Sequence, residues 1–155
     1  MQTWLETGTL SSSDTLINSK STGTRVLVLP NFRYKEFENS FAVFRNDESR
    51  LTYLTKRIIS DPNYPSSMKQ WELFVNSNPT CTYSNFRRDS LNNLSIETAD
   101  ISFKNPDNNQ DGKGKVRLIR KGGLIYALQI MSNAEAWDRV SSEIGRIENS
   151  FEIRE

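Results

Sequence analysis

The chain has 155 residues, the length of one ordinary domain. Its 20 basic and 19 acidic side chains leave a net charge of +1, so the basic excess that is typical of nucleic-acid-binding proteins is missing. The chain has no histidine and one cysteine, which excludes histidine-ligated zinc, serine–histidine triads and internal disulfides. No apolar run approaches the ~20 residues that a membrane-spanning helix needs.

The amino-terminal segment, residues 1–24, is rich in hydroxyl and amide side chains, which compete with backbone pairing and offer little surface to bury. We expect a weakly ordered lead-in there, with a short edge strand near Leu16–Ile17. Residues 25–155 are expected to form a single domain. Its first strand is predicted at 25–29, where Pro30 ends the run, and a second extended stretch is predicted at 32–44, with a bend at 39–40.

Two helices are expected next. Leu51, Leu54 and Ile58 recur at spacings of 3 and 4, which predicts a helix capped by Asp47. A second apolar stripe predicts a helix that begins after Ser66 or Ser67. This stripe consists of Met68, Trp71 and either Phe74 or Val75. The prolines at 62 and 65 separate the two helices because proline lacks the backbone donor that a continuing helix requires.

Alternating apolar residues between 81 and 131 predict a meander of strands, in which Gly122 and Gly123 form a hairpin turn. The amphipathic stripe that begins at Trp137 predicts a helix, and Phe151 and Ile153 predict a last short strand. Strands joined by short turns pair antiparallel. The sequence therefore predicts an α+β fold with a central antiparallel sheet of about six strands flanked by helices.

The last forty residues follow a recurring pattern of strand, glycine turn, aromatic-bearing strand, helix near a tryptophan and closing strand. The pattern is carried by Gly114–Ile119, Gly122–Leu128, Ala136–Trp137 and Asn149–Ile153. It resembles the carboxy-terminal part of PsbP-like proteins, a superfamily that includes the photosystem II extrinsic protein, a Ran-binding nuclear import factor, bacterial lipoproteins and secretion chaperones. The resemblance implies a central antiparallel sheet with flanking helices. It implies no single function, because these proteins share architecture rather than chemistry.

A motif like the opening of a calcium-binding loop begins at Asp107. Its oxygen ligands would be Asp107, Asn109 and Asp111, followed by the glycine of a tight turn. The positions that should hold an apolar residue and a bidentate glutamate hold Gly114 and Leu118 instead. A solvated turn is therefore favoured over a calcium site.

Five cations lie between residues 113 and 121 without an acid among them. On a strand, Lys115 and Arg117 point to the same side. We take Lys115, Arg117, Arg120 and Lys121 as a candidate surface for an anionic protein partner. The alternative is a solvated strand face whose charges discourage aggregation.

Catalytic signatures are missing: there is no G-x-S-x-G motif and no phosphate-binding glycine loop, and Cys81 has no histidine to activate it. We predict no enzymatic activity and no cofactor. The preferred hypothesis is an accessory or protein-binding domain that acts through a protein partner and does not bind nucleic acid. The alternative is a small-ligand or calcium-binding protein of the cell envelope, which would use a sheet–helix cleft or the Asp107–Asp111 loop. We expect the bacterial cell envelope, as a lipoprotein, or the cytoplasm, depending on what precedes Met1.

Overall fold

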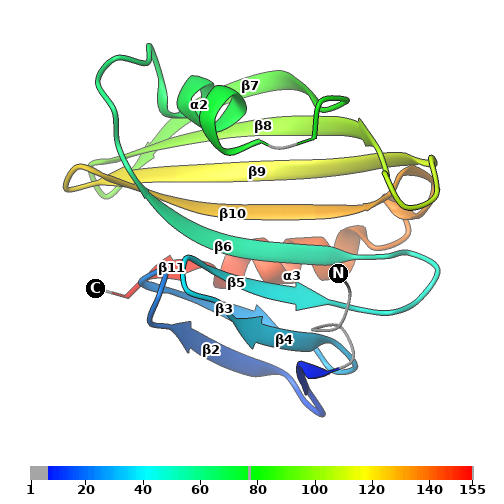
Figure 1. The fold of residues 1–155 in the computed structure, drawn as a ribbon. Coiled ribbons are helices and arrows are strands. Elements are labelled where there is room, and N and C mark those ends of the chain that lie inside the picture. The colour runs from blue at the N-terminus through cyan, green and yellow to red at the C-terminus, as the bar shows by residue number, and fades with distance from the viewer. Residues whose placement is uncertain (1–6, 77, 155) are drawn as a thin grey trace.

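The computed structural model describes residues 7–76 and 78–154 as two antiparallel sheets and a few short helices (Figure 1). The large sheet has eight strands in the order β1-β4-β5-β6-β10-β9-β8-β7, and the small sheet has three in the order β11-β3-β2. The large sheet comprises β1 (Thr9–Leu10), β4 (Arg33–Glu36), β5 (Ser40–Phe44), β6 (Thr52–Ile59), β7 (Thr82–Leu91), β8 (Leu94–Lys104), β9 (Asp111–Lys121) and β10 (Leu124–Asn133). The small sheet comprises β2 (Thr15–Ser19), β3 (Thr24–Val28) and β11 (Glu152–Ile153). The helices are α2 (Ser67–Gln70), the π-helix η1 (Trp71–Val75), the 3-10 helix η2 (Ala134–Ala136) and α3 (Ser141–Ser150).

The large sheet is the middle layer of the molecule. Helix α3 and the small sheet cover one of its faces, and α2 with η1 lies against part of the other (Figure 1). Each face has its own apolar cluster. The α3 side buries Phe32, Phe41, Val43, Tyr53, Leu128, Ile130, Ile144 and Ile147, among others, and the α2 side buries Met68, Trp71, Tyr83, Ala99, Ile101, Val116, Leu118, Ile125 and Ala127. The expected α+β fold is confirmed, with a sheet of eight strands rather than about six.

The described part of the expected lead-in, residues 7–24, is built into the domain. It contributes β1 to the large sheet and β2 to the small one, so the edge strand expected near Leu16–Ile17 is present. Thr22 and Thr24 are buried, and their hydroxyls lie 3.1 and 3.0 Å from the hydroxyl of Thr55 on β6. This hydroxyl-rich segment can be buried because its side chains satisfy one another's hydrogen-bonding groups.

The first expected helix is wrong, because its residues form β6 in the centre of the large sheet. Tyr53 and Thr55 are buried towards the small sheet, while Leu54 and Lys56 point to the opposite face. This alternation with a period of two residues is that of a β-strand, and β6 pairs with β5 on one side and with β10 on the other. The spacing of 3 and 4 residues between Leu51, Leu54 and Ile58 therefore does not reflect a helix.

The other expected elements are present with changed bounds. Gly122 and Gly123 form the β9–β10 turn with φ angles of 59° and 78°, a conformation that favours glycine. The second expected helix begins as α2 and continues as the π-helix η1, whose Trp71 is 2% exposed while Phe74 is 69% exposed. The last helix starts later than expected, because β10 runs on to Asn133.

Candidate functional site

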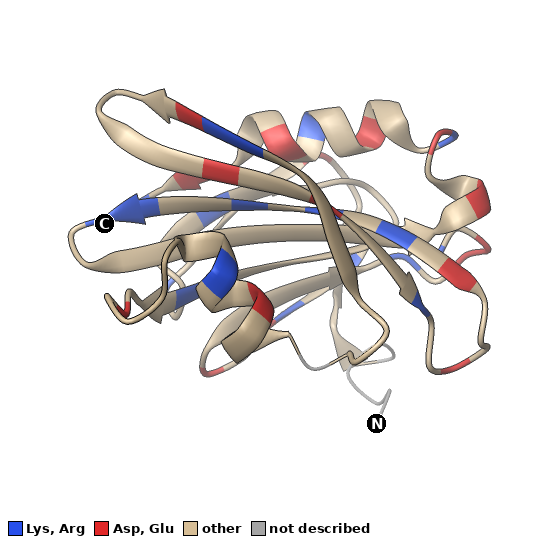
Figure 2. Cartoon of the chain, turned by 90° about the horizontal axis from the view of Figure 1, so that it is seen from above, with Lys and Arg blue, Asp and Glu red and all other residues tan. Residues whose placement is uncertain are grey.

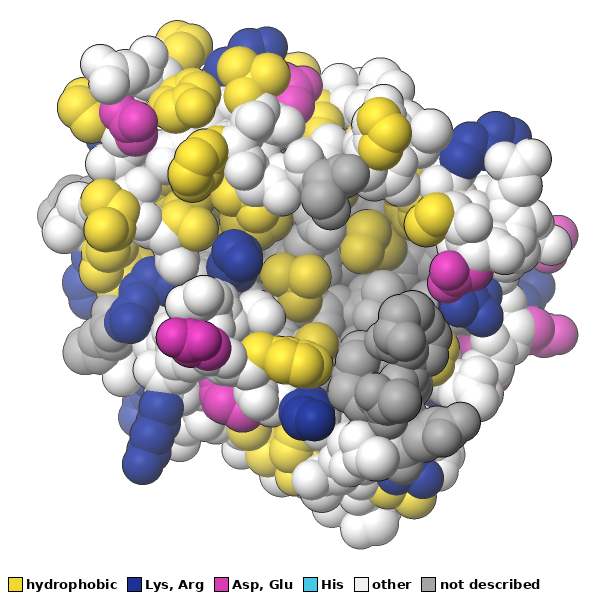
Figure 3. All heavy atoms as spheres, in the orientation of Figure 1, with side chains coloured by type: hydrophobic (Ala, Val, Ile, Leu, Met, Phe, Trp, Pro, Cys, Tyr) yellow, Lys and Arg dark blue, Asp and Glu magenta, His cyan; other side chains and the backbone are white. Residues whose placement is uncertain are grey.

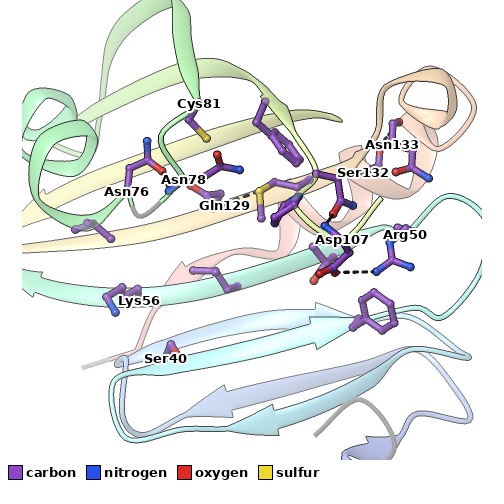
Figure 4. Close-up of a pocket in the computed structure, with 18 of the residues that line it drawn as sticks. Ser40, Arg50, Lys56, Asn76, Asn78, Cys81, Asp107, Gln129, Ser132 and Asn133 are labelled. Atoms are coloured by element: carbon purple, nitrogen blue, oxygen red, sulfur yellow. Dashed lines mark hydrogen bonds and ion pairs between the residues drawn. The ribbon is translucent and has the colours of Figure 1, made fainter. Parts of the chain in front are cut away.

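A cleft of about 510 Å³ opens on the α2 side of the large sheet (Figures 3 and 4). Helix α2 contacts β8 and β9, so no described helix covers β5 and β6 on this side. The floor of the cleft is formed by β5, β6 and β10. Its walls are η1 with the segment up to Cys81, and the turn at 105–107 between β8 and β9. The cleft thus gathers residues from five separate parts of the chain.

The apolar wall of the cleft is firmly held. Trp71 is almost fully buried, and its indole N–H donates to Oε1 of Gln129 on β10 at 3.2 Å. Leu54, Val75 and Phe103 line the cleft and pack against the buried cluster of the α2 side. A ligand would therefore meet a preformed apolar surface.

The amide side chains that line the cleft differ in how many of their hydrogen-bonding groups already have a strong partner within the protein. Asn78 accepts from the backbone N–H and the hydroxyl of Thr80 and donates to the carbonyl of Lys104. Gln129 uses its oxygen to hold Trp71, but its Nε2 contacts only the thioether sulfur of Met131, at 3.5 Å, which is a weak acceptor. The floor of the cleft consequently presents an amide N–H group that can donate a hydrogen bond to a carbonyl oxygen of a ligand.

Charge is distributed unevenly along the cleft. Arg50 lies at one end, where it pairs with Asp107 at 3.5 Å and its guanidinium is 5.9 Å from the Phe44 ring centroid. Lys56 lies at the other end, near Ser40 (Figure 4). Within residues 7–76 and 78–154, no acidic side chain forms an ion pair with Lys56. The cleft therefore carries one neutralised cation and one free one.

Cys81 belongs to the wall of the cleft. Burial raises the pKa of its thiol, so the protonated form prevails at neutral pH. A protonated thiol is a poor nucleophile and a poor metal ligand.

The residues of the calcium-like motif form a turn that is closed by its own backbone. Asp107 pairs with Arg50, whereas Asp111 pairs with Lys104 at 2.7 Å, so the two carboxylates serve different cations. Asn109 adopts a left-handed φ of 58° and donates its backbone N–H to the carbonyl of Asn105 at 2.7 Å. In the described part of the chain, no three acidic or cysteine side chains gather as they would around a metal ion.

The candidate partner-binding residues of β9 do not share one surface. Lys115 and Arg117 point towards the α3 side, where Lys115 pairs with Glu148 of α3 at 3.0 Å. Arg120 alternates with them and points to the α2 side, and Lys121 is exposed at the end of the strand. Figure 2 shows acidic residues interspersed with basic ones over these strands and α3.

The neighbouring strands add further charges of both signs. Asp100 of β8 lies opposite Lys115 and pairs with Arg87 at 3.2 Å. Burial raises the pKa of Asp100, but hydrogen bonds from Asn85 and Arg87 outweigh it, and the pKa is lowered. The α3-side face of β7 to β9 is thus a mixed-charge surface.

The sequence predicts a sheet–helix cleft as an alternative site but does not identify the residues that line this one. Leu54 and Lys56 were assigned to a helix, and their neighbours on β10, Gln129 and Ala127, are more than seventy positions away in the chain. One signal was present: Gln129 is a polar residue within the apolar run of β10. A polar side chain in a central strand marks either a buried hydrogen bond or a cleft, and Gln129 has both.

Comparison with known proteins gives similarity of structure only. No protein-family model and no curated protein matches the chain. Its fold is similar to the solution structure of cyanobacterial PsbP (CyanoP) from Synechocystis sp. PCC 6803, with a TM-score of 0.68 and 10% identity over 92% of this chain and 94% of that one. It is also similar to LpqN of Mycobacterium tuberculosis, described as involved in cell envelope biogenesis, with a TM-score of 0.58 and 12% identity over 98% and 95% of the two chains.

A third similar structure, a protein of unknown function and putative regulator from Pseudomonas aeruginosa, has a TM-score of 0.54 and 10% identity over 86% of this chain and 92% of that one. The chain therefore has a PsbP-like fold. The likeness extends over almost the whole chain, well beyond the carboxy-terminal part on which the resemblance was first based. Among the described helices, none is long and apolar enough to cross a membrane.

Proposed function

We propose that the protein is a non-enzymatic accessory protein that binds a segment of a protein partner in the cleft between η1 and strands β5, β6 and β10. The observation that carries this proposal is the cleft itself, a preformed hollow that lies over a rigid sheet. LpqN is involved in cell envelope biogenesis, and this neighbour supports the cell envelope as the location of the proposed complex.

The chemistry of the lining suits a polypeptide segment. Leu54, Val75 and Phe103 offer apolar surface for side chains, and the Nε2 group of Gln129 offers a donor for a backbone carbonyl. A segment that lies across the floor would use both at once.

The carboxylate and the thiol of the lining favour binding over catalysis. General acid–base catalysis needs a titratable group free to exchange a proton with the substrate, and nucleophilic catalysis needs an activated nucleophile. The carboxylate of Asp107 is bonded to Arg50, and the raised pKa of Cys81 leaves its thiol protonated. We give the cleft precedence over the basic residues of β9 as the partner site, because those residues point to different sides of the sheet.

A small ligand in the same cleft is the second candidate function. The volume of about 510 Å³ lies within the range of roughly 300–1,000 Å³ that is typical of small-molecule sites. Such a ligand would raise the melting temperature of the protein without requiring a polypeptide.

The test is a selection of displayed random peptides, roughly twelve residues long, against the intact chain and two variants. Leu54→Trp places a larger side chain on the cleft floor. Leu16→Trp is the matched control, because Leu16 is an exposed leucine on β2 of the other sheet. Circular dichroism and thermal unfolding are used to check that both variants are folded.

We expect peptides that bind the parent chain and Leu16→Trp equally and lose about tenfold or more in affinity for Leu54→Trp. Recovery of no peptide whose binding depends on the cleft refutes the proposed function. A small-molecule library screened by melting temperature against the same three proteins then tests the second candidate.

A further inference from the structure

The floor of the cleft continues onto a strand face that carries two lysines. Residues directly opposite each other in an antiparallel pair point to the same side of the sheet. Lys35 of β4 lies opposite Ala42 of β5, which lies opposite Leu54 of β6, and Leu54 lines the cleft. Lys35 and Lys56 therefore project from the same face, on strands β4 and β6.

These two ammonium groups have no carboxylate partner in the described part of the chain. Lys35 faces only the Phe37 ring, with its Nζ 5.6 Å from the ring centroid, and this contact leaves its charge uncompensated. The exposed side chain of Lys35 and the half-buried one of Lys56 carry their charges to the border of the cleft.

The described acidic residues near this face form no ion pair with Lys35 or Lys56. Glu36 points to the opposite side of β4, where it accepts hydrogen bonds from the hydroxyls of Ser19 and Ser21. Asp107 lies at the far end of the cleft and is paired with Arg50. Glu38 lies in the turn between β4 and β5 and forms no ion pair with another described residue. The chain as a whole has a net charge of only +1, so an uncompensated pair of cations on one face is a local feature.

We propose that the segment bound in the cleft is acidic, with carboxylates that pair with Lys56 and Lys35 while its apolar side chains pack against Val75 and Leu54. This inference rests on the proposed function, since it specifies the partner of the same cleft. Lys35 and Lys56 are separated by two strand spacings and by two residues along the strand, about 12 Å in all, which an extended segment covers in about three to four residues. The segment therefore has two acidic residues about three to four positions apart.

The experiment uses the cleft-dependent peptides recovered from the displayed library. Their sequences are compared with the unselected library, and synthetic copies are titrated against two double variants. Lys35→Glu with Lys56→Glu reverses the charge at the cleft. The matched control, Lys20→Glu with Lys113→Glu, makes the same change in net charge at two exposed lysines, of which Lys113 lies on the opposite face of the sheet.

We expect the recovered peptides to be enriched in aspartate and glutamate, at a spacing of about three to four residues. Their affinity is expected to fall about tenfold or more in the cleft variant and about twofold or less in the control. Raising sodium chloride from about 50 mM to about 500 mM is expected to weaken binding, because salt screens the charge pairs.

Two results overturn the inference while the proposed function stands: cleft-dependent peptides without acidic enrichment, or an equal loss of affinity in both double variants. Recovery of no cleft-dependent peptide overturns both the function and the inference. The two failures are distinguished by Leu54→Trp, which blocks the cleft without changing its charge.

Discussion

Glu97 is expected to anchor the wall of the cleft to the sheet. Its two carboxylate oxygens accept the backbone N–H groups of Ser67 and Met68, at 3.2 and 3.0 Å, so the start of α2 is held on β8. The side chain of Glu97 is only 12% exposed, and Arg88 lies 4.0 Å away. Helix α2 leads directly into η1, so this contact positions Trp71 as well.

Glu97→Ala removes both acceptors and leaves two backbone donors in a partly buried place. Loss of a helix N-cap costs typically ~1 kcal/mol, and hydrogen bonds to a charged group are worth more than neutral ones. We therefore expect the free energy of unfolding to fall by about 2 kcal/mol, which lowers the melting temperature by about 4–8 °C in a domain of this size. Glu97→Gln keeps one acceptor oxygen and is expected to cost about half as much.

Urea and thermal unfolding followed by circular dichroism measure both variants. Glu135→Ala is the control, because Glu135 is an exposed glutamate outside the cleft. If Glu97→Ala lies within about 0.5 kcal/mol of the parent or matches Glu135→Ala, the carboxylate does not hold α2 and the reasoning is refuted.

Three further predictions follow from contacts on the rest of the sheet and on α3. Millimolar calcium is expected to leave the melting temperature unchanged, because Asp107 and Asp111 are already paired with cations; a rise that Asp107→Asn abolishes would establish a calcium loop. The lowered pKa of Asp100 means that its charge stabilises the fold above the ordinary aspartate pKa of about 3.9, and that this contribution is lost as the pH falls through the lowered value. Urea titrations are thus expected to show Asp100→Asn less stable than the parent at neutral pH, with no difference in strong acid. In thermal unfolding, Gly145→Ala is expected to stabilise α3 by up to about 1 kcal/mol, because a Cβ there meets open space. Gly114→Ala is expected to destabilise the protein, because its Cβ would lie 2.7 Å from a backbone carbonyl oxygen of β10. The opposite order of stabilities would contradict the packing described for α3 and these strands.

The carboxy-terminal half of the fold could be predicted because its signals are local. A glycine pair between two long alternating runs specifies the β9–β10 hairpin by itself, and the stripe of Val140, Ile144 and Ile147 specifies the face that α3 buries. These elements needed no knowledge of distant residues. Their bounds shifted by a few residues, but their types are those expected.

The amino-terminal half was predicted less well because its structure depends on distant partners. Burial of Thr22 and Thr24 is favourable only when Thr55 completes the hydroxyl cluster, more than thirty positions along the chain. Likewise, β6 is a strand because β5 and β10 flank it. The lining of the cleft could not be inferred, since its residues come from separate parts of the sequence and meet only in the folded sheet. The spacing of charges on β9 was visible in the sequence, but Glu148, which neutralises Lys115, was not recognisable as a partner.

The position of β6 has a consequence for how such a protein can diversify. One set of its residues, Tyr53 and Thr55, is fixed by the buried core, and the alternate set, Leu54 and Lys56, faces the cleft. Of the second set, Leu54 also packs against the buried cluster of the α2 side, whereas Lys56 belongs to neither apolar cluster. A change at Lys56 therefore alters the charge of the cleft with little effect on the packing of the sheet, although its neighbours along the same strand are fixed by the core.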